Sequence, residues 1–200
     1  MTVVAIWCRH LKDNVIGIGH QIPWNAPRDV QNFLDIVAKG KVVCGRKTYE
    51  SLPDDALNSC FIYMMTRQTD YVVKDMNKHK VISSQRDFAD LEEDEVLYVI
   101  GGAEIYKLFM NGKEKLKPHI IVDCVYTEAL NSICGSLVDI SSCVQNMEKS
   151  YFRISSYYKV DDVVSAVWVR KGEFVAQSEL RKIIQILSKD AEVLETFVCV

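Results

Sequence analysis

Short apolar runs alternate with amphipathic stretches from the N-terminus to Gly135. The runs rich in β-branched and aromatic residues predict strands: TVVAIW, KVVCG, CFIYMMT, HKVIS, VLYVIGG and HIIVDCVYT. The stretches with apolar positions at helical spacing predict helices: RDVQNFLDIVAKG, RDFADLEED and GGAEIYKLFMNG. Such an alternation is typical of a mainly parallel sheet with crossover helices.

Two longer extended runs follow Gly135, and the pattern changes from alternation to pairing. The runs SYFRISSYYKV and VVSAVWVRKG are joined by Asp161 and Asp162, residues typical of a tight turn. They predict an antiparallel hairpin that closes the sheet. The chain has no internal repeat and no low-complexity linker, so residues 1–172 are expected to form one α/β domain.

An extension over residues 173–200 contains a predicted amphipathic helix, SELRKIIQILSKDAEVLET at 178–196. Ser178 suits the N-cap position. One apolar stripe recurs at helical spacing: Leu180, Ile183, Ile184, Leu187, Ala191 and Leu194. The pattern favours a helix that packs on its own domain, and a homodimer contact is the alternative. A polar face that mixes acids with bases disfavours a membrane-surface helix.

Composition limits the partners and the compartment. The net charge of -3, without any run of basic residues, argues against nucleic acid and anionic membranes as partners. Seven cysteines without a CxxC pair indicate reduced thiols, with neither a disulfide framework nor a metal site. No stretch approaches the roughly 18 apolar residues of a membrane span. The N-terminus lacks a secretory segment. We expect a cytoplasmic protein that is monomeric or homodimeric.

One acid, Asp29, stands among Gly, Pro, Trp and Phe in the segment VIGIGHQIPWNAPRDVQNF. Pro27 suits the first turn of a helix, where the helix dipole favours an acid. Asp29 and Phe33 are four residues apart and share a face, which Ile36 and Val37 continue into the core. Capping the helix does not require an acid on its buried face, so Asp29 is a candidate ligand-binding residue.

Three strand-to-helix junctions carry residues suited to phosphate. After one strand, Gly45 precedes Arg46, Lys47 and Thr48 in GRKTYE, and MTRQ ends the next strand. The pair Gly101 and Gly102 lets a ligand approach the backbone closely before a helix begins. Each motif alone is weak, but three at the same edge of one sheet indicate a dinucleotide site.

The segments VIGIGHQIPWNAPRDVQNF, GRKTYESLP, MTRQ and VIGGAEIY, in this order and spacing, resemble the dihydrofolate reductase family over about residues 2–172. The resemblance implies an α/β single domain with a mixed, mainly parallel eight-stranded sheet flanked by helices, to which this chain adds a C-terminal helix. It also implies NADPH as cofactor and a small pterin substrate. The implied enzyme reduces 7,8-dihydrofolate to 5,6,7,8-tetrahydrofolate for one-carbon and thymidylate metabolism.

The resemblance assigns residues as well. Asp29 falls on the family's active-site acid, and Ile22 and Trp24 on the loop that closes over the nicotinamide; these are the implied catalytic residues. The implied substrate-binding residues are Ile6, Asp29, Phe33, Leu57, Ile100 and Tyr106. The implied cofactor-binding residues are Ile16, Gly17, Gly45, Arg46, Lys47, Thr48, Thr66, Arg67, Gln68, Gly101, Gly102, Ala103, Glu104 and Ile105. No metal is implied.

Residue chemistry suggests how such a site works. A buried carboxylate facing a 2-amino-4-oxo ring makes two charge-assisted hydrogen bonds, and a closed, dry site brings the reacting carbons together. Asp29 is too far round the ring to protonate N5. We expect a water admitted beside Ile22 to deliver that proton, while Asp29 orients and polarises the ring.

The chain departs from the family pattern at two positions. Cys60 stands where the family has an arginine for the glutamate tail of the substrate, and no Lys or Arg occurs from Ser51 to Thr66. Either another cation reaches the tail or the substrate lacks it. Asp123 stands where a threonine supports the acid, so Asp123 either shares a proton with Asp29 or faces outward through a register change. The loop EALNSICGSLVDI also lacks the family's Gly-Asp pattern, which predicts a different loop closure.

These departures leave two alternative functions. One is a reductase of a tail-free pterin or of a flavin precursor, although Asp29 argues against the flavin version. The other is a catalytically weak reductase-like binding module that displays the C-terminal helix. Weak NADPH binding or absent turnover in a folded protein would distinguish the binding module.

Overall fold

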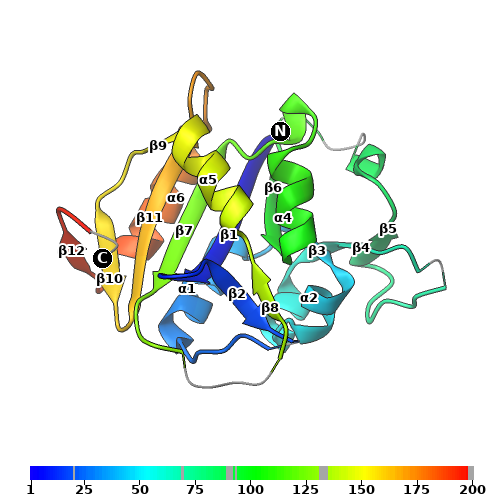
Figure 1. Ribbon diagram of the computed structural model, residues 1–200. Coiled ribbons are helices and arrows are strands. Elements are labelled where there is room, and N and C mark those ends of the chain that lie inside the picture. Colours follow the sequence, from blue (N-terminus) through cyan, green and yellow to red (C-terminus); the bar gives the residue numbers. More distant parts are fainter. Residues whose placement is uncertain (20, 69, 89–91, 93, 131–134, 198–200) are drawn as a thin grey trace.

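The computed structural model describes residues 1–19, 21–68, 70–88, 92, 94–130 and 135–197 (Figure 1). Its main sheet has ten strands in the order β12-β10-β11-β7-β1-β6-β3-β4-β5, with β9 paired to β11. The strands are β1 (Thr2–His10), β3 (Lys41–Gly45), β4 (Phe61–Met65), β5 (His79–Ile82), β6 (Val96–Gly101), β7 (Ile120–Tyr126), β9 (Tyr151–Arg153), β10 (Tyr157–Val160), β11 (Val163–Arg170) and β12 (Glu192–Leu194). A separate ribbon pairs β2 (Val15–Ile18) with β8 (Leu137–Asp139).

The mixed, mainly parallel sheet of the prediction is confirmed. Strands β5, β4, β3, β6, β1 and β7 are parallel neighbours, and β11 joins β7 antiparallel. The hairpin predicted around Asp161 and Asp162 is β10–β11. The strand number differs from eight, because the run SYFRISSYYKV splits into β9 and β10 and because β12 adds an edge strand.

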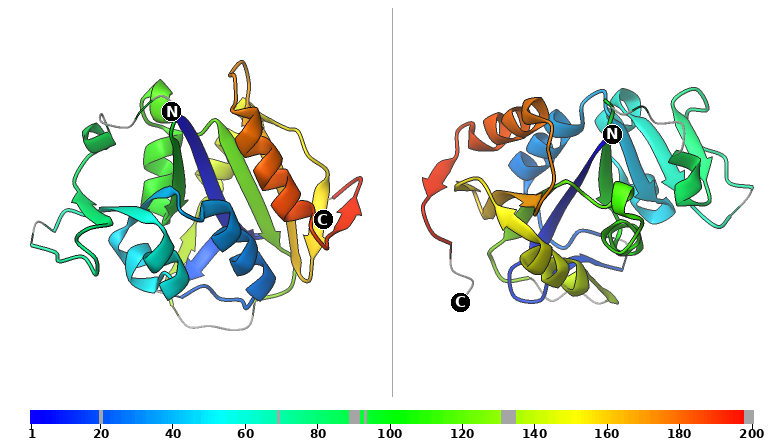
Figure 2. Two further views of the ribbon diagram at one scale, coloured as in Figure 1. Left: turned by 180° about the vertical axis from the view of Figure 1, so that it is seen from behind. Right: turned by 90° about the horizontal axis from the view of Figure 1, so that it is seen from above.

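Helices cover both faces of this sheet. They are α1 (Pro27–Val37), α2 (Arg46–Ser51), α3 (Asp54–Ser59), α4 (Ala103–Met110), α5 (Ser141–Ser150) and α6 (Gln177–Ser188). Figure 1 shows α4 and α5 on the near face, and Figure 2 shows α1 and α6 on the far face. Alternate residues of β1 enter the two core clusters: Val4 and Ile6 on the face of α1, and Val3, Ala5 and Trp7 on the face of α4.

The prediction of an α-helix in RDFADLEED is wrong over the described residues, where the structure has only a short 3-10 helix at Gln85–Phe88. Asp87 explains the difference: its carboxylate accepts hydrogen bonds from the backbone N–H groups of Ser83 and Ser84, each at 3.0 Å. An aspartate that bonds to its own backbone favours a turn over a helix. The later part of that segment, at 89–91 and 93, lies outside the described residues.

The C-terminal helix packs on its own domain, as the pattern favoured. Leu180, Ile183 and Leu187 of α6 are buried in the core cluster that α1 also joins. The helix starts at Gln177 after an N-cap that is not Ser178, and it ends at Ser188. Asp190 has a φ of 59°, a left-handed conformation that stops the helix and turns the chain into β12. Among the described helices, none is long and apolar enough to cross a membrane.

Candidate active site

The residues of the predicted site gather where β1, β3 and β6 end and the helices after β3 and β6 begin. Gly45 and Gly102 are the N-cap positions of α2 and α4. A Cβ at Gly45 would meet the Ile105 side chain at 3.4 Å, and one at Gly102 would meet Thr48 Oγ1 at 3.4 Å. The β3–α2 and β6–α4 junctions therefore lie against each other, as expected for neighbouring parallel strands.

Asp29 lies in the first turn of α1. Pro27 is at the start of this helix, where its missing N–H costs nothing, and the N-cap Ala26 makes no side-chain cap. Ile36 and Val37, at 1% and 0% exposure, anchor the far end of the helix in the core. Phe33, one turn after Asp29, packs against the same cluster, so α1 directs the acid and the aromatic ring towards the sheet.

Two thiols face the Asp29 carboxylate. Cys8 of β1 and Cys124 of β7 are register partners on adjacent strands. Burial raises the pKa of Asp29, while hydrogen bonds from the Cys124 and Cys8 thiols partly lower it. Burial and the nearby Asp29 charge raise the pKa of both thiols well above the usual value, so both stay neutral S–H donors. Ser165 of β11 donates in turn to Cys124 Sγ at 3.3 Å.

Asp123 neither shares a proton with Asp29 nor faces outward, which corrects both alternatives. Its side chain is buried, at 4% exposure, on the face of β7 opposite to the Cys124 side chain. There it accepts hydrogen bonds from Trp7 Nε1 at 2.7 Å and from Arg9 Nε and Nη2 at 2.8 and 2.9 Å. The position that faces the acid from the neighbouring strand is Cys124, one residue later.

Tyr106 closes the site between β1 and β6. Its hydroxyl donates to the Ile6 carbonyl at 2.6 Å, and its ring packs edge-on against Trp7. The Gly101–Gly102 peptide bond is cis, and Gly101 has a φ of 107°. A Cβ at Gly101 would lie 2.9 Å from the Tyr106 ring, so only glycine fits there. Ile6 and Ile100 are buried beside this junction, at 7% and 8% exposure.

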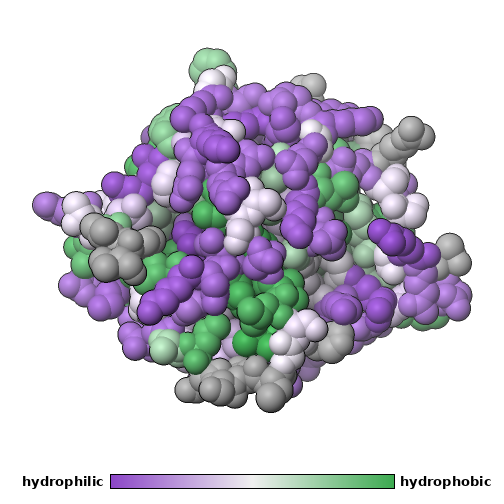
Figure 3. Space-filling model, viewed as in Figure 1, coloured by the Kyte–Doolittle hydropathy of each residue, from purple (hydrophilic) through white to green (hydrophobic). Residues whose placement is uncertain are grey.

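The loop residues differ in how firmly they are held. Trp24 stacks on Tyr126 at the end of β7, with ring centroids 5.2 Å apart. Ile22 is 64% exposed, so its side chain is free to cover a ligand. Ile16 and Gly17 lie on β2, which pairs with β8. Figure 3 shows an apolar area on the otherwise polar surface over this ribbon. Leu137 of β8 is itself 61% exposed.

The other predicted cofactor residues lie at the C-terminal ends of β6, β3 and β4 and at the starts of the helices that follow. Lys47, Arg67, Gln68 and Glu104 are exposed, and Arg46 is held by Glu50 at 2.9 Å. Thr66 Oγ1 accepts from the Gln68 backbone N–H at 3.1 Å, which shapes the turn after β4. Ala103 and Ile105 are buried in the first turn of α4. The described residues contain no group of three or more side chains that could hold a metal ion.

Two residues of the tail region are inside the protein. Leu57, predicted to contact substrate, exposes only 4% of its surface and packs in the core. The Cys60 thiol donates to the Val37 carbonyl at 3.3 Å, at the end of α1. Burial raises the pKa of Cys60, and the Lys182 ammonium nearby partly lowers it. A cation therefore does reach this region, from α6, but it is bonded to protein groups.

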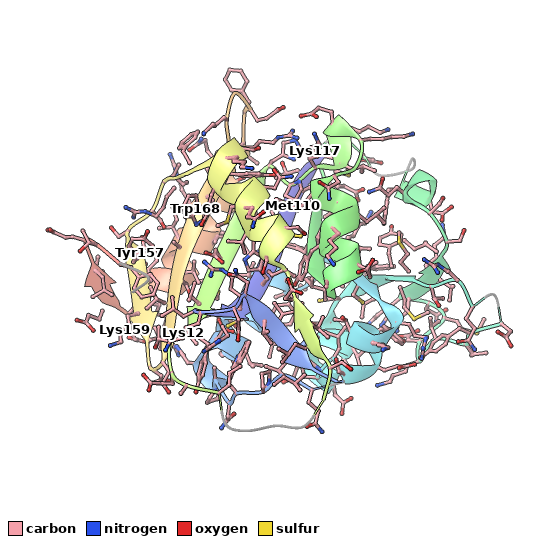
Figure 4. All side chains as sticks on the ribbon, in the orientation of Figure 1. Lys12, Met110, Lys117, Tyr157, Lys159 and Trp168 are labelled. Atoms are coloured by element: carbon pink, nitrogen blue, oxygen red, sulfur yellow. The ribbon has the colours of Figure 1, made fainter. Side chains whose placement is uncertain are left out.

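A separate crevice of about 270 Å³ lies at the opposite end of the sheet. Met110 and Lys117, labelled in Figure 4, line it together with Arg170. The Arg170 guanidinium already pairs with Glu114 and Glu173, each at 2.9 Å. The guanidinium in this crevice is thus paired within the protein, and the crevice lies away from the predicted site.

The family model for dihydrofolate reductase matches residues 2–129. The chain belongs to the dihydrofolate reductase family. A dihydrofolate reductase of Mycoplasma pneumoniae is 30% identical over 167 residues, which are 79% of this chain and 98% of the relative. One of Mycobacterium leprae is 31% identical over 110 residues, 54% of this chain and 66% of the relative. With that relative, the similarity therefore spans about two thirds of its length.

Solved structures of dihydrofolate reductases share this fold. Dihydrofolate reductase from Enterococcus faecalis, complexed with NADP(H) and RAB-propyl, superimposes with a TM-score of 0.65 and 18% identity. The superposition covers 85% of this chain and 96% of that one. The superposition thus covers a larger share of the chain than the residues 2–129 matched by the family model.

Sequence reasoning missed the thiols and the charges around α1. Cys8 follows Ile6 by two residues and so shares its face of β1, a signal that was available from the strand period alone. The pairing of Arg9 with Asp123 joins residues 114 positions apart, and no local sequence pattern predicts it. The same holds for Lys182, whose partners lie on α1 and β6.

Proposed function

We propose that this member of the dihydrofolate reductase family reduces 7,8-dihydrofolate to 5,6,7,8-tetrahydrofolate, with NADPH and one proton consumed and NADP+ released. The observation that carries the proposal is the half-buried Asp29 carboxyl beside Cys8 and Cys124, with no cation among the described groups that shift its pKa. An acid in such a place is a functional candidate, because its burial serves no ion pair. It matches the hydrogen-bond donors of a 2-amino-4-oxo pterin ring.

Asp29 binds and orients the ring. Its two oxygens accept hydrogen bonds from the ring N–H and the exocyclic amino group, while the Phe33 ring packs against the pterin face. The partial burial that raises the pKa of Asp29 also limits its contact with water, which strengthens these bonds. Ile6 and Ile100 provide the apolar walls. The proton for N5 arrives through a water beside the exposed Ile22, since Asp29 holds the opposite edge of the ring.

NADPH supplies the hydride when bound, and the chain has residues that fit it. The space over Gly102, next to Thr48 Oγ1, lets a cofactor approach the backbone at the start of α4. Lys47 and Arg67 are exposed cations at the ends of the neighbouring strands and would hold phosphates. Gly45 and Gly101 face the Ile105 and Tyr106 side chains and let the two junctions pack closely at this edge.

For assembly and location we infer a cytoplasmic monomer. The stripe of α6 that would form a dimer contact is covered by the same chain, which supports a monomer. Cys8, Cys44, Cys60, Cys124 and Cys143 are all free thiols, which supports a reducing compartment. Sedimentation of the purified protein at dimer mass would contradict the monomer.

NADPH oxidation with dihydrofolate, measured for the wild type and for Asp29→Asn, tests the proposed function. The asparagine keeps the shape but turns one acceptor oxygen into a donor, so kcat/KM should fall by about 10²- to 10³-fold, in the range of other single polar groups in active sites. Asp35→Asn is the matched control, because Asp35 is an exposed acid on the same helix and accepts a hydrogen bond from the exposed Gln31 at 2.8 Å. It should leave kcat/KM unchanged.

The substrate is tested by a parallel assay with a tail-free dihydropterin. A protein that reads the glutamate tail through some cation should prefer dihydrofolate. Equal kcat/KM for the two substrates would show that the tail is not recognised, in keeping with Cys60 at the family's arginine position. An inactive wild type, or an Asp29→Asn variant with full activity on both, would refute the proposed function.

A further inference from the structure

Neither end of α1 has a side-chain cap of its own, and at its C-terminal end the Gly40 backbone N–H donates to the Val37 carbonyl at 2.8 Å. The N-cap Ala26 provides no side-chain hydrogen bond, and the last turn contains no basic residue. Helix ends leave backbone N–H and C=O groups without helical partners, and a cation near the C-terminal carbonyls stabilises the helix. The helix that carries Asp29 therefore depends on contacts from elsewhere to fix its ends.

Residues of the C-terminal extension supply contacts at both ends. Near the end of α1, Lys182 Nζ donates to the Ile36 carbonyl at 2.6 Å. At its start, Arg28 Nη2 donates to the Lys189 carbonyl at 3.3 Å and to Asp190 Oδ2 at 3.0 Å. The middle of α6 thus meets the end of α1, and the residues just after α6 meet the start of α1. The two helices run antiparallel, side by side behind the sheet (Figure 2).

Lys182 is itself held in place by a buried network. Its ammonium donates to the Tyr98 hydroxyl at 2.9 Å, and that hydroxyl donates to Glu179 Oε1 at 2.6 Å. Glu179 also pairs with Lys182 at 3.5 Å. Tyr98 and Glu179 are buried, at 2% and 8% exposure. The network ties α6 to β6, and through Lys182 to the last turn of α1.

Apolar packing restrains α1 sideways. Ile36 and Val37 of α1 lie in one core cluster with Leu180, Ile183 and Leu187 of α6. This cluster continues to Phe33 and to Cys8, which faces Asp29. A shift of α6 would therefore move the core residues against which Asp29 and Phe33 pack.

We propose that α6 is a positioning element of the substrate site, and that Lys182 is a positioning residue that sets Asp29 and Phe33 by holding the end of α1. The inference rests on the proposed function. A helix is stiff over the seven residues from Asp29 to Ile36, about 10 Å, so holding one end fixes the direction of the other. The proposed cofactor residues lie on other elements, mainly α2 and α4. Loss of Lys182 should therefore affect the pterin and spare NADPH.

The test compares Lys182→Met with Lys171→Met. Lys171 is a matched control, because its Nζ donates at 2.7 Å to the Lys149 carbonyl near the end of α5, away from the site. We expect Lys182→Met to raise KM for dihydrofolate about tenfold, as misplaced active-site groups do, with KM for NADPH within about twofold of wild type. Lys171→Met should change neither value. Lys182→Arg, which keeps a cation donor, should restore most of the substrate affinity.

Hydrogen exchange provides a readout without turnover. The amides of α1 should lose protection in Lys182→Met, whereas those of α4 should not. If Lys182→Met does not fold, Asp190→Asn takes its place, because Asp190 is exposed and holds the opposite end of α1 through Arg28. It should raise the substrate KM by about twofold, in line with a weak surface pair.

The outcomes separate the two proposals. A wild type without NADPH oxidation refutes the proposed function, and the inference fails with it. An active wild type in which Lys182→Met matches Lys171→Met, or raises both KM values equally, refutes the positioning role alone. For the replacement variant, an Asp190→Asn protein with wild-type KM values has the same meaning.

Discussion

Asp29 and Asp123 are two acids at the same pair of strands, on opposite faces. Asp123 is surrounded by Trp7 Nε1 and the Arg9 guanidinium, which meet it with three hydrogen bonds between 2.7 and 2.9 Å. Among the described residues, the groups that hydrogen-bond to Asp29 are two neutral thiols, and burial raises its pKa. Asp123 is thus paired inside the protein, whereas Asp29, the acid of the proposed site, is expected to keep hydrogen-bonding capacity for a ligand. We therefore expect substitution of Asp123 to affect mainly stability and substitution of Asp29 to affect mainly activity.

Removing the paired acid has the largest expected effect on folding. Asp123→Asn takes the counter-charge from the Arg9 guanidinium in a buried place, so the free energy of unfolding should fall by about 3–5 kcal/mol. Chemical denaturation monitored by circular dichroism measures it. Asp139→Asn, on the exposed ribbon strand β8, is the control and should change stability far less. A loss under about 1 kcal/mol for Asp123→Asn would remove the contrast between the two acids.

The unpaired acid should respond in the opposite direction, and only in one pH range. The folded-state pKa of Asp29 is raised, so its ionised form destabilises the folded protein above that pKa. Asp29→Asn should therefore be more stable than wild type at neutral pH. The gain should shrink as the pH falls through the folded pKa and vanish below the unfolded one. Thermal unfolding of both proteins along a pH series measures this, and a stability loss at neutral pH would contradict it.

Changing the thiols beside Asp29 should have the smallest effect of these substitutions. Cys124→Ala removes a donor to the ionised carboxylate, so the pKa of Asp29 should rise and the acidic limb of the kcat/KM profile should move to higher pH. Activity on that limb should fall about two- to fivefold, less than the cost of a full hydrogen bond to a charge. Cys124→Ser, a stronger donor, should move the limb the other way.

Cys143→Ala is the control for the thiols, because Cys143 is equally buried but lies on α5 in the other core cluster. It should reduce stability without moving the pH profile. Identical profiles for all three cysteine variants would show that the thiols only fill space.

The sequence predicted the elements of the fold well because their signals are local. The position of Asp29 after Pro27, and its spacing from Phe33, follow from the helix pattern and agree with α1. The sequence did not predict which face of β7 the Asp123 side chain occupies. In a strand, a shift of one residue exchanges the two faces, and nothing in IIVDCVY says whether Asp123 or Cys124 faces the acid. Only the register of β7 against β1, Cys8 opposite Cys124, decides it.

The surroundings of α6 show the same limit. Its apolar stripe was visible in the sequence, and its burial on the domain agrees. Its end at Ser188 was not visible, because Ala191 and Leu194 continue the helical spacing while Asp190 turns the backbone. The bond from Lys182 to the Ile36 carbonyl crosses 146 positions of sequence, and a lysine on a helix surface gives no sign of such a partner.

The contact between α1 and α6 also determines when, during synthesis of the chain, α1 can be covered by α6. About 140 residues separate the end of α1 at Val37 from the start of α6 at Gln177. At roughly 5–20 residues per second, a ribosome needs about 7–28 s to synthesise that stretch. During this interval the growing chain exposes the apolar side of α1, with Ile36 and Val37, before its covering helix exists. The contact between α6 and this side of α1 therefore forms only after the strands and helices between them have been synthesised.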